Sequence, residues 1–416
     1  MTLRRRCLPL ALAALALAAC ARPPRAQDAY ARAVAEAVPL VEKGTGLTFK
    51  RAPAYQVRTR EQMHDFLQKV FAQEKSQRDI AEQQTVLRRL GAIPDTLDLH
   101  QLMLDVYTEQ VAGLYDPKSK TLFLVEGTDP AVLDFTVQHE LVHALQDQYM
   151  NLDSLENLKG DDDRSLAAAA VIEGQATLVP LQAVLGPGAN FPGGWDRVRD
   201  AIRDNASSMP VMARTPEFLQ EMMIFPYVSG AEFVHRFQVR MPGKMPYGAD
   251  LPTSTAQVIH GGAFFDTPRQ QPVEIALPAP RGAVLEYDNV MGEFATKVLL
   301  YELLKDANGA ALAADGWVGD RYAVLKAPQG TGVAWLTVLR SAVDAGEFAQ
   351  AMESLAAARY PGARGVKHGT ATTFTVNGRV VTVWGGEVNG RAAVLYLDLP
   401  AGERADPFDL AKVRLN

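Results

Sequence analysis

Cysteine is scarce in this chain, and the positions of its cysteines exclude a disulfide framework. The 416 residues contain two, Cys7 and Cys20. Cys7 lies in an N-terminal segment with the features of a removable signal, so Cys20 is the only cysteine expected in the mature chain. One cysteine cannot form an intramolecular disulfide, even in an oxidising compartment.

Other features are missing as well. The chain has no glycine-rich phosphate-binding loop, no G-x-S-x-G nucleophile motif and no internal repeat. Positive charge is not in excess, because the formal net charge is −6. An acidic surface argues against nucleic acid or an anionic membrane face as the main partner. With 48% hydrophobic and 22% charged residues, the composition excludes a disordered or fibrous chain.

The N-terminus resembles a bacterial lipoprotein signal. Arg4, Arg5 and Arg6 precede an apolar run at residues 8–19, which is shorter than the roughly 20 residues that span a bilayer. The run ends in Leu-Ala-Ala-Cys, which looks like a lipobox and implies cleavage before a lipidated Cys20. Loss of the three arginines would change the net charge from −6 to −9. The alternative is an ordinary small-residue cleavage site followed by an incidental cysteine.

The pattern of apolar residues predicts mainly helices in the first part of the mature chain. We expect helices at 28–43, 59–72, 81–90 and 97–111, and strands within 47–57 and at 121–125. Thr59 with Gln62 is a capping-box signal. Asp129 and Pro130 then begin a helix that runs to about Tyr149.

A second long helix, the middle of the chain and an alternating C-terminal part follow. We expect the helix at 165–185, and short helices with long loops in the proline- and glycine-rich stretch 186–282. Beyond it, Asn377-Gly378 is a two-residue hairpin signal. The C-terminal elements that we expect are helices at 292–304 and 345–359 and strands at 322–325, 333–339, 372–383 and 392–399.

Residues 139–143 read His-Glu-Leu-Val-His and carry the clearest chemical signal. On a helix, positions i and i+4 share a face, so His139 and His143 can bind one metal ion. Glu140 is then placed to take a proton from a water on that metal. Two scattered surface histidines are the alternative, but the apolar neighbours of this helix predict that it is buried. Buried imidazoles and a buried carboxylate need partners, and a metal supplies one.

A catalytic zinc ion usually has three protein ligands, and Glu173 is the best third candidate. It lies 30 residues after His143 in an apolar, alanine-rich stretch, so that a loop and a second helix can bring it back to the first. Burying an unpaired glutamate there would be costly; a solvent-facing glutamate on an amphipathic helix is the alternative. The metzincin extension is excluded, because Gln146 and Tyr149 stand where that class has glycine and histidine. The competing ligands are His64, His100, His235, His260 and His368.

A resemblance supports this assignment. Residues 139–148 (HELVHALQDQ) followed by 173–176 (EGQA) are similar to bacterial neutral zinc metallopeptidases of the gluzincin clan. Residues 254–260 (STAQVIH) and 316–322 (GWVGDRY) resemble stretches of the same group. The resemblance implies a thermolysin-like catalytic core and hydrolysis of peptide bonds. The group often has aspartate two residues after the third ligand, whereas this chain has Gln175, so a ligand-orienting group there would be uncharged.

Three further residues and one strand are candidates for supporting roles. Asp147, four residues after His143, can orient that imidazole, or it can be a solvated residue near the helix end. Tyr227 and His260 are candidates to stabilise an oxyanion, although each can equally be structural. The strand at 121–125 is either an edge along which a peptide adds by main-chain hydrogen bonds or an internal strand.

The sequence therefore predicts an α+β, two-lobed zincin-like metallopeptidase, with the helix that carries Glu140 at the cleft and a small mixed sheet near the C-terminus. The expected division is a signal peptide at 1–19, a lipid-anchored tether at 20–27, the metallopeptidase region at 28–310 and a C-terminal subregion at 311–416. We expect one Zn²⁺ per chain, a peptide or protein substrate, no nucleic acid and a lipid anchor in the bacterial cell envelope. The alternative is an envelope lipoprotein that binds zinc without catalysis; in that case a structural site should have four protein ligands.

Overall fold

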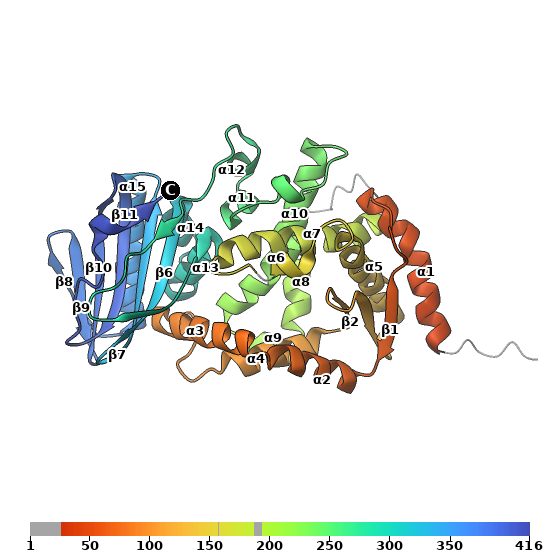
Figure 1. Cartoon of the computed structure of the whole chain (residues 1–416), viewed down its shortest axis with the longest axis horizontal. Coiled ribbons are helices and arrows are strands. Elements are labelled where there is room, and N and C mark those ends of the chain that lie inside the picture. Colours follow the sequence, from red (N-terminus) through yellow and green to blue (C-terminus); the bar gives the residue numbers. More distant parts are fainter. Residues whose placement is uncertain (1–25, 157, 187–193) are drawn as a thin grey trace, which may run out of the picture.

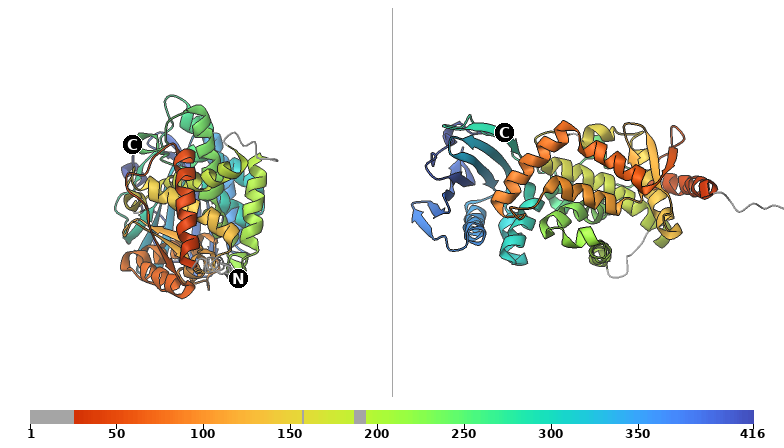
Figure 2. Two further views of the ribbon diagram at one scale, coloured as in Figure 1. Left: turned by 90° about the vertical axis from the view of Figure 1, so that its right-hand side faces the viewer. Right: turned by 90° about the horizontal axis from the view of Figure 1, so that it is seen from below.

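The computed structural model describes residues 26–156, 158–186 and 194–416. The expected signal peptide and Cys20 lie outside these residues, as does most of the tether. Within them the chain is a mixed α+β protein. It is elongated, with a three-stranded sheet at one end, a helical body in the middle and a larger sheet at the other end (Figure 1). Figure 2 shows the same long axis from below, with the C-terminal sheet and the N-terminal helix at opposite ends.

The small sheet has strand order β1-β3-β2, where β3 (Thr121–Val125) pairs in parallel with β1 (Ala54–Arg58) and antiparallel with β2 (Gly113–Asp116). All five residues of β3 are buried. Of the two alternatives for this strand, the internal strand is confirmed, because partners occupy both of its sides. The edge beside the next helix is formed by β2, which the sequence analysis missed.

Four helices lie around this sheet, and local signals predict the limits of some of them better than of others. They are α1 (Ala26–Thr45), α2 (Arg60–Phe71), α3 (Glu74–Leu90) and α4 (Leu99–Gln110). The predicted capping box is confirmed: Thr59 accepts from the Gln62 N–H while the Gln62 side chain accepts from Thr59. Helix α3 begins seven residues before the expected Ala81, because the polar residues before it continue the helix without an apolar stripe.

Three long helices form the core of the helical body. These are α5 (Pro130–Gln146), α7 (Asp162–Leu185) and α10 (Glu217–Arg240). Helix α5 ends three residues before the expected Tyr149, and α7 begins at Asp162, because Asp161 caps it through the Arg164 N–H. The expectation of only short helices in 186–282 is wrong: α10 is 24 residues long, with Pro226 inside it.

Helices α7 and α10 pack at very close range through two glycines. A Cβ on Gly174 would lie 2.2 Å from the Gly230 carbonyl carbon, and one on Gly230 would lie 2.0 Å from the Ala170 oxygen. Small residues on α7 do permit close helix approach, as expected, and here they serve the contact with α10. Helix α7 is long and apolar enough to cross a membrane by length and composition, but 61% of its most apolar window is buried within the protein.

Shorter elements complete the helical body. They are α6 (Leu152–Glu156), α8 (Gly194–Ser207), α9 (Pro210–Arg214), the 3₁₀ turn η1 (Gly248–Asp250), α11 (Thr255–Ile259), α12 (Gly261–Phe265), α13 (Gly292–Leu304) and α14 (Ala307–Asp315). The predicted bounds of α13 are confirmed.

The C-terminal sheet is larger than predicted and wholly antiparallel, so the expectation of a small mixed sheet is wrong. Its seven strands have the order β5-β6-β7-β11-β10-β9-β8. They are β5 (Val284–Asn289), β6 (Trp317–Ala327), β7 (Gly330–Leu339), β8 (Gly365–His368), β9 (Ala371–Val376), β10 (Arg379–Val388) and β11 (Arg391–Pro400). Edge strand β5 lies before residue 311, in the part of the chain that was predicted to belong to the metallopeptidase region. The predicted hairpin is present, with positive φ at Asn377 and Gly378.

The central strands of this sheet are covered on both faces. Helix α15 (Ala342–Arg359) covers one face, where Trp335 packs edge-on against Phe348. On the other face Leu336 and Leu395 pack with Phe408 and Val413 from the C-terminal segment. That segment ends in η2 (Leu410–Lys412) and β12 (Arg414–Leu415), which pairs with β4 (Ile275–Ala276).

Buried carboxylates join this sheet to the helical body. Asp320 on β6 accepts hydrogen bonds from the Met291 and Gly292 N–H groups and from the indoles of Trp317 and Trp335. Burial raises the pKa of Asp320, and these four donors oppose the rise. The N-terminus of α13 is thereby fixed on the sheet, and α13 in turn packs against α10.

Candidate metal centre

The three predicted metal ligands lie together. The Nε2 atoms of His139 and His143, one turn apart on α5, are 3.2 Å from each other. The Glu173 Oε2 atom on α7 lies 3.1 Å from the first and 3.4 Å from the second. Among the described residues, the group of histidine and acidic side chains whose ligand atoms gather here has these three members. The expected arrangement, two histidines from one helix and a glutamate from the next, is what the chain folds into.

The spacing of these atoms suits a single small ion. A tetrahedral zinc site with bonds of about 2.0–2.2 Å has about 3.4 Å between neighbouring ligand atoms. The distances of 3.1, 3.2 and 3.4 Å are close to that value for all three pairs. Two imidazoles and one carboxylate are also a donor set typical of catalytic zinc. The residues present therefore fit the ion that the sequence implies.

Glu140 lies beside the cluster and is held in place from β2. It is 9% exposed, and its Oε2 accepts a hydrogen bond of 2.8 Å from the Tyr115 N–H. Its carboxylate is not a member of the ligand group. A carboxylate held by one oxygen keeps the lone pairs of the other available, as a general base requires.

The charges of the cluster are strongly coupled. Burial alone would lower the pKa of His143, but the Glu173 carboxylate raises it to about 9 in the metal-free protein. Burial alone would raise the pKa of Glu173, but the charge of His143 and hydrogen bonds from both histidines lower it well below its ordinary value. The negative charge of Glu173 thus favours a cation at this place, and without a metal ion a proton on the His143 imidazole supplies the positive charge.

A chain of amides orients the second histidine. The Nδ1 of His143 lies 3.1 Å from the Gln146 Oε1. The Gln146 amide donates onward to the Ile172 carbonyl at 3.0 Å and to the Gln175 Oε1 at 2.9 Å. Gln146 and Gln175 are both fully buried. Because an amide oxygen can only accept, Nδ1 must carry a proton. In the neutral ring that binds a metal, Nε2 therefore has the lone pair, directed toward the ligand group.

This chain of amides bears on two of the candidates for supporting roles. Asp147 does not orient His143; it accepts hydrogen bonds from the Tyr115 hydroxyl and the Lys120 ammonium, both at 2.7 Å. The helix turns so that position i+3, not i+4, meets Nδ1, and Gln146 has that role. Gln175 does take part, but through Gln146 and with a hydrogen bond from the Tyr247 hydroxyl.

Of the two candidates for oxyanion stabilisation, one lies at the cluster. The ring of Tyr227 on α10 stacks on His139, with centroids 6.0 Å apart and 19° between the planes. The Glu173 carboxylate and burial raise the pKa of Tyr227 well above its ordinary value, so its hydroxyl stays protonated and can donate. His260 lies elsewhere, between α11 and α13.

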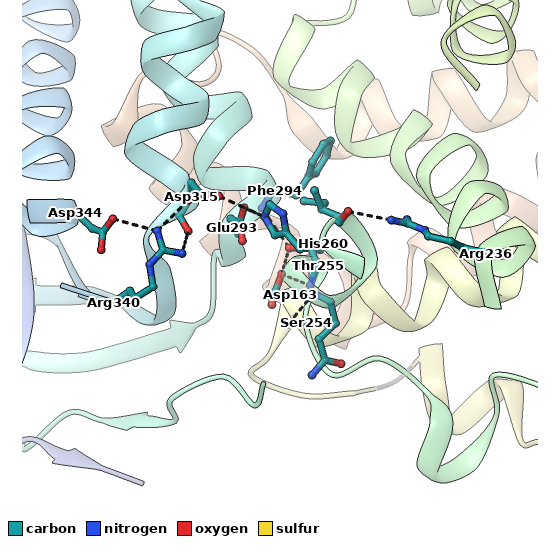
Figure 3. Close-up of polar contacts among 12 residues, drawn as sticks. Asp163, Arg236, Ser254, Thr255, His260, Glu293, Phe294, Asp315, Arg340 and Asp344 are labelled. Carbon is teal, nitrogen blue, oxygen red and sulfur yellow. Dashed lines mark hydrogen bonds and ion pairs between the residues drawn. The ribbon is translucent and has the colours of Figure 1, made fainter. Parts of the chain in front are cut away.

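His260 belongs to a separate cluster at the junction with the sheet (Figure 3). Its Nε2 lies 2.6 Å from the Glu293 Oε1 and 4.0 Å from the Asp315 Oδ1. Arg340 already pairs with Asp315 at 2.9 Å. This guanidinium satisfies the carboxylate, so we interpret the cluster as a network of ion pairs that joins α13 and α14 to the sheet.

The remaining histidines are not near the ligand group. His64 lies beside Asp65, His100 bonds the Phe71 carbonyl, His235 packs on Trp195, and His368 is exposed on β8. None of them competes with Glu173 for the ion.

An apolar cavity of about 420 Å³ opens beside the cluster. Glu173 and Tyr227 line one part of it, and α3, α4, α7, α10 and the start of α13 supply its other walls. The cluster thus reaches, through Glu173, a space large enough for a ligand.

Comparison with known families covers only a C-terminal part of the chain, with most of the large sheet and helices α13, α14 and α15. Residues 283–394 match a family model described as a domain of unknown function, DUF8575. This match spans β5 to the first strand residues of β11 and contains none of the metal-cluster residues. No curated protein and no solved structure matches the chain.

Proposed function

We propose that this protein is a zinc-dependent peptide-bond hydrolase of the gluzincin kind, acting in the bacterial cell envelope. The observation that supports this most strongly is the ligand group itself: His139, His143 and Glu173 offer three atoms 3.1–3.4 Å apart, with Glu140 beside them but outside the group. Three protein ligands are typical of catalytic zinc, whereas structural sites use four. A structural site also has no need of a carboxylate at position 140.

Zinc held by His139, His143 and Glu173 would polarise the scissile carbonyl and lower the pKa of the attacking water. Glu140 accepts the proton of the attacking water and can return it to the leaving nitrogen. The Tyr115 N–H holds the Glu140 carboxylate in place for both transfers. The Tyr227 hydroxyl can donate to the developing oxyanion, and the amide chain from Gln175 keeps His143 in the correct tautomer.

The two-lobed zincin-like fold is part of the same proposal. It is supported by the order of elements along the chain, in which the capped helix α5 follows a three-stranded sheet and α7 returns with the third ligand. The edge strand β2, which binds Glu140 through its backbone, lies where an extended substrate could be received.

The direct test replaces Glu140 with glutamine, which keeps the size of the side chain but cannot accept the proton. Purified wild type and Glu140→Gln are compared for bound zinc and for hydrolysis of a peptide library. We expect one zinc per chain in both and a rate about 10²–10⁴-fold lower in the variant. Full activity in Glu140→Gln would remove this residue from the mechanism. A wild type that binds zinc but cleaves nothing would favour the non-catalytic alternative.

We also propose that the mature chain is anchored by a lipid on Cys20, on the strength of the Leu-Ala-Ala-Cys sequence. The test is mass spectrometry of the mature N-terminus together with membrane fractionation. Cys20→Ala should release or mislocalise the protein. A mature chain that begins at Ala21 or later would show that Cys20 is not modified.

A further inference from the structure

A groove of about 460 Å³ lies along a second face of helix α10. Its lining residues on that helix run from Glu217 to Arg236 at a spacing that keeps them on one side. The cavity beside the metal cluster uses another side of α10, which includes Met222, Pro226 and Tyr227. The two hollows have no lining residue in common, so the groove is separate from the proposed active site. Residues of α8, α11, α13 and α14 form its other walls.

The floor of this groove is apolar. It is formed by buried side chains from three helices, namely Phe225, Val228, Val258, Phe294 and Val298. The rings of Phe225 and Phe294 are in contact, with centroids 4.1 Å apart. A volume of about 460 Å³ is in the range of small-molecule sites, which are typically about 300–1,000 Å³. The groove can therefore hold a small ligand with an apolar body.

Several charged side chains around the floor already have a partner of opposite charge. Their salt bridges are Arg203 with Glu221 at 2.6 Å, Glu217 with Lys305 at 3.1 Å and Arg199 with Asp196 at 2.8 Å. Because these charges are compensated within the protein, they do not call for a ligand.

Arg236 lies at one end of the groove, where its guanidinium reaches the end of α11 (Figure 3). It donates to the backbone carbonyls of Val258 and Ile259 at 3.0 and 3.4 Å. Its Nε is buried and has no hydrogen-bond acceptor among the described residues. Neutral carbonyls do not compensate a full positive charge, so Arg236 remains available to an anionic group.

Two further charged side chains of the groove have no salt bridge within the described part of the chain. Lys297 has its Nζ 6.0 Å from the Phe294 ring centroid, and Glu293, one turn before it, is already paired with His260 at 2.6 Å. Glu232 on α10 likewise lines the groove without an ion pair. An unpaired charge in a half-buried position is unfavourable. Each of these groups would therefore be stabilised by a ligand of opposite charge.

From this arrangement we propose that the groove binds small zwitterions with apolar side chains, such as dipeptides whose two termini are free. The carboxylate terminus pairs with Arg236 and Lys297, the ammonium terminus pairs with Glu232, and the apolar side chains lie on the floor. A ligand with only one of the two charges would leave part of the groove unpaired. Hydrolysis of peptides would release such molecules, but the groove is made by residues outside the metal cluster, so this assignment does not depend on the proposed hydrolase activity.

The test measures binding of Leu-Phe, N-acetyl-Leu-Phe and Leu-Phe amide by isothermal titration calorimetry. Zinc-loaded Glu140→Gln is used so that the probes are not hydrolysed. Blocking either terminus removes one charge-assisted contact and should weaken binding roughly tenfold or more. Lys297→Gln should weaken binding of Leu-Phe by a similar factor without weakening binding of the amide. Glu232→Gln should weaken binding of Leu-Phe without weakening binding of the N-acetyl peptide.

Lys326→Gln is the matched control, because Lys326 pairs with Glu286 at 2.9 Å on the C-terminal sheet and should leave all three affinities unchanged. Neither Lys297→Gln nor Glu232→Gln breaks a described salt bridge, so both variants should fold. Binding of Leu-Phe that neither substitution changes would place the peptide elsewhere, for example at the metal cluster, and would overturn the assignment. Equal affinity for Leu-Phe and N-acetyl-Leu-Phe would show that the groove selects an anion and not a zwitterion. A lack of Leu-Phe binding at millimolar concentration would refute the site itself.

Discussion

Replacing Glu173 with alanine should leave two histidine ligands in the proposed metal centre. Its Oε2 lies 3.1 Å and 3.4 Å from the two imidazole nitrogens, so no other described side chain is placed to substitute for it. Zinc binding to a four-ligand protein site is worth about 10–16 kcal/mol at neutral pH, or about 2.5–4 kcal/mol per ligand. Loss of one ligand should therefore weaken zinc binding by roughly 10²–10³-fold.

The fold should survive this change. Glu173 is 25% exposed in its side chain and lines the cavity beside the cluster, so water can fill the space that it leaves. Alanine is also the better helix former in α7. The variant should thus keep its circular dichroism and melting transition in the metal-free state, lose zinc on dialysis, and regain part of its peptidase activity in excess zinc.

The assay is metal content by mass spectrometry, with zinc affinity from competition against a chelator of known strength. Controls are His100→Ala and His235→Ala, whose rings contact Phe71 and Trp195 far from the ligand group. Both should retain one zinc per chain. If Glu173→Ala keeps stoichiometric zinc while a histidine control loses it, the third ligand is a histidine and the gluzincin proposal is wrong.

Three further predictions concern the surroundings of the site. Gln146→Ala removes the acceptor of the His143 Nδ1 proton and should lower zinc affinity about 10–100-fold, measured by the same competition assay. Because metal-free His143 has a raised pKa of about 9, zinc must displace a proton below that pH. The affinity of the protein for zinc should therefore rise by up to tenfold per pH unit between about pH 6 and pH 8. An affinity that does not change with pH would show that His143 is not a ligand. Gly230→Ala places a Cβ 2.0 Å from the Ala170 oxygen and should lower the free energy of unfolding by about 1–3 kcal/mol or more in urea titrations. Unchanged stability would mean that the two helices can move apart freely.

The helices whose limits were predicted well are those with strong local signals. Thr59 with Gln62, Asp129 with Pro130, and the positive-φ pair Asn377-Gly378 act through their nearest neighbours in the chain, so the sequence alone contains the necessary information. Helix α10 was missed for the opposite reason. Its proline and glycine weaken a helix locally, and only the close contact of Gly230 with α7 explains why the helix persists.

The sheet shows the same limit. Each strand of the C-terminal part could be recognised by its apolar residues, but strand order and direction depend on pairing between segments far apart in the chain. Strand β5 lies before α13 and α14, yet it pairs with β6 after them. The apolar residues of a strand indicate that it is buried, but they do not indicate which strand pairs with it.

For the metal centre, the sequence by itself determined the residues that a helix brings together. His139, Glu140 and His143 follow from the period of the α-helix, whereas Glu173 was a candidate from its apolar context and from the resemblance, with a solvent-facing glutamate as the alternative. Only the tertiary structure decided what supports them: that Gln146 and not Asp147 meets His143, that the Tyr115 N–H holds Glu140, and that Tyr227 and not His260 lies at the cluster. The reason is physical. Spacing within one helix is fixed by backbone geometry, whereas contacts between elements depend on how closely they pack. The close approach of Gly174 and Gly230, for example, brings α10, which carries Tyr227, against α7.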